Sequence, residues 1–437
     1  MNDAIRPGKL GILVGGGPAP GINGVISSVT IEAVNRGIEV IGFVDGFKWL
    51  AQGNADHRRS LTIEDVKSIH WRGGSILGTS RANPTKSEEA LKNVLDVFAR
   101  LHVSALVTIG GDDTAFSAKE VYARAKGAIR VAHVPKTIDN DIPLPGSVPT
   151  FGFETARQLG AQIVRNLAED ARTCSRWYLI ICMGRAAGHL ALGIGKAAGA
   201  TLTVIPEEFT NSSLTFDELC DILVGAIIKR KSQKSQHGVA VLAEGLLEAI
   251  GERGLSSVLS AGPAGRYGKV QRDPHGHLRL GEIEFGRMLK DTLGERLEQL
   301  GIQVTLIDQN LGYELRCADP GAFDAHYTRD LGYGAVKFLR SPAAAEMAAI
   351  VSFENSRLQP LPFEALFDMS SGRMRQRRVD VEAEGYECAR RYMIRLEPSD
   401  FSDPHKLASL AAAAGMNDAD FRARFEHLVA DRQSREG

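Results

Sequence analysis

The sequence has few of the features that mark secreted, zinc-binding or membrane proteins. Its five cysteines include no CxxC pair, so they indicate reduced thiols rather than a disulfide framework. No apolar run approaches the length needed to cross a bilayer, and the first residues form no apolar signal segment. We therefore expect a soluble cytoplasmic protein with no membrane partner.

The chain also lacks an excess of charge of either sign. It has 52 lysines and arginines against 53 aspartates and glutamates, which gives a net charge of -1. This balance argues against bulk electrostatic binding to nucleic acid, although it leaves room for a local basic pocket. With 437 residues, 43% of them hydrophobic, the chain is long enough for two or three domains with cores of their own.

What the chain does contain is a repeated pattern of apolar strand, glycine turn and helix. Residues 10–14 lead into the glycine loop 15–23, and residues 103–109 lead into the turn 110–114. Glycine turns let backbone N–H groups approach phosphate oxygens, and a helix N-terminus adds partial positive charge. The first loop has neither the GxGxxG nor the Walker spacing. A plain strand-to-helix turn therefore remains the alternative.

Charged side chains follow successive predicted strands. The strand at 128–134 should end at Pro135, and the stretch 136–141 should form a loop. Since parallel strands with right-handed crossovers end at one edge of a sheet, these side chains should gather beside the first glycine loop. A lysine, a hydroxyl and carboxylates there suggest phosphate, magnesium and a general base, whereas a solvated turn is the simpler alternative. The side chains are Asp112, Asp113, Lys136, Thr137, Asp139 and Asp141.

Other loops add candidates with weaker signals. Arg81 follows glycines and hydroxyls and could fork onto a phosphate, although a surface arginine is an equal alternative. In the second half, predicted strands at 177–182 and 238–243 end at Met183 and Glu244. His275 and His277 form an HxH in the polar stretch 251–280, where solvated histidines are more common than metal ligands.

In series, these motifs resemble the phosphofructokinase family, and within it the pyrophosphate-dependent branch. The resemblance covers about residues 10–355, and the motifs occur in the family's order and approximate spacing. They are the loop 15–23, Arg81, the turn 110–114, the stretch 135–141, residues 183–185, Glu244 and residues 313–316.

The resemblance implies magnesium-assisted (Mg2+) phosphoryl transfer to O1 of fructose 6-phosphate. It makes Asp139 the general base, within reach of the attacking hydroxyl, and Asp112 the magnesium-linked acid. Lys136 and Arg185 would join Asp139 in catalysis, because fixed cations meet the charge of a phosphoryl-transfer transition state. The implied substrate-binding residues are Gly17, Arg81, Asp113, Lys136, Thr137, Asp141, Arg176, Met183, Gly184, Arg185, Glu244, Tyr313 and Arg316.

Within the resemblance, two positions bear on the phosphoryl donor. ATP-using members carry glycine where this chain has Asp113 and Lys136. Asp113 should fill the space of a nucleotide α-phosphate and repel it, while Lys136 should place an ammonium against pyrophosphate. The resemblance therefore implies pyrophosphate as the donor and a readily reversible reaction.

The chain also departs from the family. Ile307 stands where a 6-phosphate arginine is usual, so other sugar phosphates such as sedoheptulose 7-phosphate could serve as acceptors. Residues 25–31 lack effector arginines, and Thr201 replaces an effector-site acid, which predicts no control by ADP or phosphoenolpyruvate. Arg176, Tyr313 and Arg316 match positions at the 6-phosphate. Because family members often borrow an arginine there from a neighbouring subunit, we expect a homodimer or homotetramer.

The implied fold is α/β, with two Rossmann-like three-layer domains, mostly parallel sheets and the active site in the cleft between them. Residues 1–150 with about 316–367 would bind the donor and magnesium, and 151–315 would bind the sugar phosphate. Residues 368–437 would form a mainly helical C-terminal extension, with no chemistry assigned to it.

Three alternatives compete with this interpretation. An ATP-dependent phosphofructokinase is disfavoured by Asp113 and Lys136. An NAD or lipid kinase with a similar glycine–acid turn would lack the full series of motifs. A non-catalytic regulatory subunit would be expected to have lost Asp139 or Asp112, and the chain retains both.

Overall fold

Two stretches of chain alternate to build two structural units. The computed structural model describes residues 8–209, 214–260, 266–269, 271, 280–368, 370 and 372–429. Unit 1 comprises Met1–Ala156 and Tyr313–Arg377, and unit 2 comprises Arg157–Gly312 and Arg378–Gly437. The C-terminal segment therefore contributes to both units. Among the described residues, no helix is long and apolar enough to span a membrane.

Unit 1 is built on an eight-stranded, mostly parallel sheet. Its main path runs in the order β12-β11-β5-β4-β1-β2-β3, and β6 pairs with β5 beside this path. Among the strands that the structure describes in this sheet, the outer strands β3 and β12 pair antiparallel with their neighbours. The strands are β1 Lys9–Val14, β2 Val40–Phe43, β3 Arg58–Leu61, β4 Val103–Gly110, β5 Arg130–Thr137, β6 Phe151–Gly152, β11 Ala349–Glu354 and β12 Arg357–Pro362.

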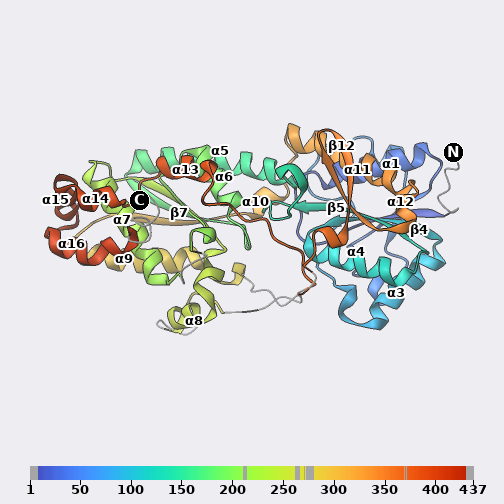
Figure 1. Ribbon diagram of the computed structural model, residues 1–437, viewed down its shortest axis with the longest axis horizontal. Helices are drawn as coiled ribbons and strands as arrows, with labels where there is room; N and C mark the ends of the chain where they lie inside the picture. Colours follow the sequence, from blue (N-terminus) through green and yellow to red (C-terminus); the bar gives the residue numbers. More distant parts are fainter. Residues whose placement is uncertain are drawn as a thin grey trace. The chain divides into compact units, whose positions relative to one another are not determined.

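Helices cover both faces of this sheet, because its central strands are apolar on both sides. On β1, Leu10 and Ile12 pack in the cluster that includes α1 and α11, whereas Leu13 packs with α3 and α4. Figure 1 shows these helix pairs on opposite faces. The helices are α1 Ile22–Asn35, α2 Ile63–Val66, α3 Glu88–Arg100, α4 Asp112–Ala125, α10 Tyr313–Arg316, α11 Ala322–Leu339 and α12 Ala343–Glu346.

Unit 2 is built on a four-stranded parallel sheet of order β10-β7-β9-β8. Helix α5, Phe153–Cys174, begins in unit 1 and continues into unit 2. The strands are β7 Arg176–Cys182, β8 Leu202–Val204, β9 Gly238–Ala243 and β10 Thr305–Leu311. The remaining helices are α6 His189–Ala198, α7 Phe216–Ser232, α8 Leu246–Ser260, α9 Phe285–Gln299, α13 Glu384–Arg391, α14 Pro398–Ser402, α15 Pro404–Ala414 and α16 Asp418–Phe425.

The C-terminal helices belong to the core of unit 2. Phe401, Leu410 and Phe421 are buried in the same apolar cluster as β7, α7 and α9. The chain before them runs along the outer strand of the sheet, where Ile394 N–H donates to the Thr201 carbonyl at 2.8 Å. The extension therefore completes the unit's core and covers part of a sheet edge that would otherwise expose unpaired backbone groups.

The α/β class and the mostly parallel sheets are confirmed, but several local expectations were wrong. Pro135 does not end its strand, because β5 continues to Thr137 and pairs there with β6. Strands β3 and β12 were not anticipated, and α8 extends into the stretch 251–280 that was expected to be a loop. His275 and His277 lie outside the described residues.

Candidate active site

The carboxyl ends of β1, β4 and β5 bring the predicted donor-site residues of unit 1 to one edge of its sheet. The three strands are neighbours and run parallel, so their ends coincide. The glycine loop and the turn after β4 meet closely at Thr114. A Cβ added at Gly15 of the glycine loop would collide with the Thr114 side chain, so this position requires a glycine.

Lys136 is the buried cation of this edge. It is 5% exposed, and its Nζ donates a hydrogen bond to the Gly17 carbonyl of the glycine loop. Its pKa is lowered to about 8, chiefly because burial disfavours the ammonium and then because the charge of Arg316 is near. Asp139 and Asp141 act in the opposite direction. Lys136 therefore carries its charge at neutral pH but holds its proton less firmly than an exposed lysine.

Three carboxylates lie close to one another at this edge, and two of them, Asp139 and Asp141, act on Lys136. The pKa of Asp141 is raised because it is partly buried, because the charge of Asp139 is close, and because that of Asp112 is also near. Thr137 supports the loop, since its Oγ1 accepts from the Asp139 N–H at 3.0 Å. Like charges held together cost free energy unless a cation joins them. This edge is therefore suited to a ligand that brings positive charge.

Asp112 and Asp113 occupy the first turn of α4, whose N-cap is Gly111. Carboxylates are favourable at a helix N-terminus because they face the partial positive charge of its free N–H groups. Both side chains are partly exposed, in contrast to the buried Thr114 that follows them. The helix thus fixes the backbone positions of the two acids and leaves their side chains accessible to solvent.

Two arginines complete the charge pattern of unit 1. Arg81 follows Ser80, which pairs with Gly15 of the glycine loop, and the charge of Arg81 reaches Lys136. Arg316 lies over the same loop: a Cβ at Gly17 would be 3.2 Å from its Nη1. Tyr313 is exposed, and its ring centre lies 4.9 Å from the Arg316 guanidinium carbon. Both α10 residues therefore belong to the donor-side unit.

The acids of this edge fit a magnesium ion in the manner typical of phosphoryl-transfer sites. The described residues contain no group of three or more histidine, cysteine or acidic side chains arranged to hold a metal alone. Mg²⁺ is commonly held by one or two carboxylates together with substrate phosphates and water. Asp112, with Asp141 or Asp139, offers that partial set, and their mutual repulsion is what such a cation would relieve.

In unit 2, the predicted sugar-binding residues lie where β7 and β9 end. Met183 N–H donates to the Leu311 carbonyl at 3.0 Å, and Glu244 N–H donates to the Cys182 carbonyl at 2.9 Å. Gly184 has a φ of +133°, a backbone conformation that favours glycine, and its N–H donates to Glu244 Oε1 at 3.3 Å. Neighbouring strands thus present residues 183–185 and Glu244 together.

Arg176 does not join this group within the chain. It begins β7, whereas Met183 follows the end of the same seven-residue strand. A strand rises about 3.3 Å per residue, so the two residues are roughly 20 Å apart. Arg176 instead lies near Asp170, with Nε 3.6 Å from Oδ2. Arg176 is therefore separated from the other predicted sugar-binding residues of unit 2.

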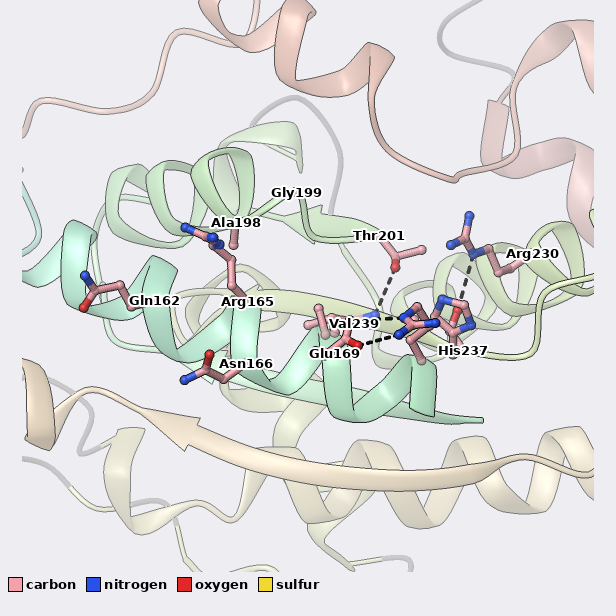
Figure 2. A pocket seen from close by; sticks show the side chains of 13 residues that line it. Gln162, Arg165, Asn166, Glu169, Ala198, Gly199, Thr201, Arg230, His237 and Val239 are labelled. Atoms are coloured by element: carbon pink, nitrogen blue, oxygen red, sulfur yellow. Dashed lines mark hydrogen bonds and ion pairs between the residues drawn. The ribbon is translucent and has the colours of Figure 1, made fainter. Parts of the chain in front are cut away.

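The Arg176 end of the unit 2 sheet also carries a pocket of 780 Å³ (Figure 2). Thr201 lies on its wall, where its Oγ1 accepts from the Val239 N–H at 3.0 Å. One of the basic side chains in the wall, Arg172, is paired with Glu169 at 2.5 Å. The lining residues are Gln162, Arg165, Asn166, Ala168, Glu169, Arg172, Ala198, Gly199, Thr201, Arg230, His237, Gly238 and Val239.

Sequence reasoning missed two residues that support the predicted loops. Asn140 lies between the two acids of the base loop and accepts hydrogen bonds from Arg377. In unit 2, Glu207 Oε1 accepts from Gly188 N–H at 2.9 Å and from Val379 N–H at 3.0 Å. The sequence offered one signal for each loop: an asparagine between two aspartates, and paired glutamates directly after a strand.

Comparisons with known proteins identify the family of the chain. Residues 9–339 match the phosphofructokinase family, so the chain belongs to that family. It is 52% identical over 421 residues to the pyrophosphate–fructose 6-phosphate 1-phosphotransferase of Thermotoga maritima, covering 96% of this chain and 99% of the relative. Its identity to the enzyme of the same name from Naegleria fowleri is 49% over 427 residues, covering 96% and 95%.

The fold is also found among solved structures. The pyrophosphate-dependent phosphofructokinase of Marinobacter aquaeolei superposes with a TM-score of 0.61 at 16% identity, covering 88% of this chain and 90% of that one. At this identity the likeness supports the fold alone. Together with the family match, it establishes the class of α/β protein to which the chain belongs.

Proposed function

We propose that the chain transfers a phosphoryl group from pyrophosphate to O1 of fructose 6-phosphate, reversibly, giving fructose 1,6-bisphosphate and phosphate. The observation that carries the proposal is Lys136, a buried ammonium that reaches the glycine loop beside the Asp112–Asp113 turn. The near full-length similarity to two enzymes named for this reaction supports it.

Asp139 is the proposed general base. Its carboxylate accepts the proton of the sugar O1 hydroxyl as the O1–P bond forms and the bridging P–O bond of pyrophosphate breaks, releasing phosphate. Thr137, whose Oγ1 accepts from the Asp139 N–H, orients the base, and Asp141 shares its loop. In the reverse direction the same carboxylate returns the proton to O1.

The cations of unit 1 bind the donor and stabilise the charge that moves during transfer. Lys136, Arg81 and Arg316 lie at one edge and interact electrostatically. Magnesium, held by Asp112 with phosphate oxygens, would neutralise part of the phosphate charge. Fixed charges of this kind stabilise the transition state without having to reorganise during the reaction. This electrostatic stabilisation is usually the largest contribution to catalysis.

We assign sugar recognition to unit 2, through Met183, Gly184, Arg185 and Glu244. Arg176 would serve the sugar phosphate of a second copy, because it stands at the far end of β7. This assignment implies a homodimer or a homotetramer. Fructose 6-phosphate is the proposed acceptor, and sedoheptulose 7-phosphate is a further candidate because Ile307 lies in β10 where an arginine is usual.

The absence of control by ADP or phosphoenolpyruvate stays a prediction. Thr201 Oγ1 accepts a hydrogen bond from the backbone of β9, so it is already engaged within the sheet. Glu169 pairs with Arg172 and so reduces the positive charge that the pocket could offer to an anionic effector. A regulatory, non-catalytic role is disfavoured because Asp112 and Asp139 are both retained at the strand ends.

The choice of donor is tested by replacing Asp113 and Lys136 together with glycine. With space for an α-phosphate and no buried ammonium, the double variant should lose about 100-fold or more in kcat/KM for pyrophosphate and gain activity with ATP. Coupled assays with each donor measure this change. Asp113→Asn keeps the size of the side chain and removes its charge, which separates steric from electrostatic exclusion. Unchanged donor preference in the double variant would refute the assignment.

A further inference from the structure

Arg377 in the C-terminal segment reaches back to the loop that carries Asp139 and Asp141. Its guanidinium donates Nε–H to the Asn140 carbonyl and Nη1–H to the Val148 carbonyl, each at 3.0 Å, and Nη2–H to Asn140 Oδ1. Its backbone N–H donates to the Asp141 carbonyl at 2.7 Å. One residue thus makes four hydrogen bonds to a loop more than 220 positions earlier in the chain.

Asn140 is the part of the loop that needs this support. Its φ is +58°, in the left-handed region that non-glycine residues enter at a cost, although asparagine tolerates it better than most. It is 8% exposed, and its Oδ1 also accepts from the Thr150 N–H at 3.1 Å. The bonds from Arg377 and Thr150 keep the turn in a conformation that the chain would otherwise populate sparsely.

We propose that Arg377 is a positioning residue for the proposed reaction: it fixes the peptide groups of Asn140 and Asp141, and with them the directions of the carboxylates on either side. The proposal rests on the assigned role of Asp139. It also gives a function to a segment that lies beyond residue 339, where the family match ends.

The chemistry of the contact explains why an arginine is present. Its planar fork reaches three separate oxygen acceptors, which a lysine ammonium on a flexible stem does not match. All three acceptors are uncharged oxygens, so these hydrogen bonds do not neutralise the charge of the guanidinium. Its positive charge therefore stays available to Asp141, which lies close enough to oppose the effect of burial on the Arg377 pKa.

The effect on turnover should exceed the effect on substrate binding. In Arg377→Ala, the Asn140 and Val148 carbonyls lose their donor and the loop can shift, and a displacement of about 1 Å can cost up to roughly 100-fold in rate. We expect kcat to fall about 10- to 100-fold, with KM for both substrates within about threefold of wild type. Arg377→Lys should recover only a small part, and added guanidinium should partly restore Arg377→Ala.

The neighbouring Arg378 provides a matched control. It is exposed, and the described part of the chain shows no hydrogen bond or ion pair of its side chain. Arg378→Ala should keep kcat within about twofold of wild type, since exposed side chains without such contacts contribute little. A second variant, Asn140→Gly, retains the left-handed turn and removes Oδ1. The Arg377→Ala change should cost less in this background, because the two residues share one network.

Hydrogen exchange of the substrate-free protein tests the contact without using activity. Arg377→Ala should speed exchange at amides of residues 139–150, with little change elsewhere, and Arg378→Ala should not. The proposal is overturned if this local exchange is unchanged, if kcat stays within twofold of the control, or if exchange rises evenly over the chain. A wild type without phosphoryl transfer would instead refute the proposed function, and the exchange difference would remain.

Discussion

The two units hold their candidate residues by different means. In unit 1, side-chain charges are packed together at the strand ends, where burial lowers the pKa of Lys136 and raises that of Asp141. In unit 2, the loop after β7 is tied by backbone hydrogen bonds to the ends of β10 and β9, and Gly184 is bonded to Glu244. Like charges therefore lie close together at the strand ends of unit 1, whereas backbone hydrogen bonds mainly fix the candidate residues of unit 2.

This difference follows from what each edge is proposed to bind. A charged donor with magnesium can compensate crowded carboxylates and a buried ammonium, so these groups cost stability only while the site is empty. A sugar is neutral apart from its phosphate and is recognised by hydrogen bonds in a fixed geometry. Substitutions in unit 1 should therefore trade stability against activity, whereas those in unit 2 should change mainly affinity for the sugar.

The largest expected effect is that of Asp139→Asn. Removing the general base should lower kcat about 1,000-fold, within the usual range for acid–base catalysis. Because one of three crowded charges disappears, the free energy of unfolding should stay the same or rise. Steady-state kinetics and chemical denaturation of the same preparation measure both quantities. A loss of less than tenfold in kcat would show that another group accepts the proton.

The next effect concerns pH and Lys136. Since its pKa is about 8, kcat/KM for pyrophosphate should decline as the pH rises through that value and the ammonium is lost. In Lys136→Arg the charge persists above pH 8, so the remaining activity should not show this decline. A wild-type profile that stays flat from pH 7 to 9.5 would contradict the role of Lys136.

The same lysine links function to stability. Its pKa is lower when folded than when unfolded, so the unfolded chain binds more protons between about pH 8 and 10.5 and this group's contribution to stability rises over that window. At pH 7 the buried charge is a net cost. Lys136→Met should then raise the free energy of unfolding by up to about 3 kcal/mol while impairing use of pyrophosphate.

A smaller effect is expected at Glu244 in unit 2. Glu244→Gln keeps the shape of the side chain but removes the charge that strengthens its hydrogen bonds, which is worth about 1.5 kcal/mol or roughly tenfold in affinity. KM for fructose 6-phosphate should rise by about that factor, with KM for pyrophosphate nearly unchanged. An equal change in both KM values would contradict the proposal that unit 1 binds the donor and unit 2 binds the sugar.

Much of the framework could be predicted from short-range patterns. Apolar runs located β1, β4 and β5, and the rule for parallel strands predicted Asp112 and Lys136 at one edge, where the end of β4 pairs with β5. The extension of β5 to Thr137 could not be predicted in this way, because it depends on pairing with β6, at residues 151–152. Local sequence does not encode which distant segment supplies such a partner.

The residues that support the predicted loops could not be predicted from the sequence for the same reason, because their partners are distant in the chain. Arg377 lies in a charged stretch with no motif, and its role depends on meeting Asn140 in three dimensions. Conversely, the motif match assigned Arg176 to the sugar phosphate without giving its place in the fold, and the strand puts it at the opposite end from Met183. The motifs thus identified which side chains are suited to binding and catalysis, and the fold determines which of those side chains lie close together.

The central claim is that Lys136 and Asp113 make pyrophosphate the donor. The most direct measurement is the initial rate of fructose 6-phosphate phosphorylation by the purified wild-type chain, with pyrophosphate or ATP at equal concentration and excess magnesium. The account predicts rapid turnover with pyrophosphate and a rate at least about 100-fold lower with ATP, a discrimination of about 2.7 kcal/mol. Equal rates, or a preference for ATP, would contradict it.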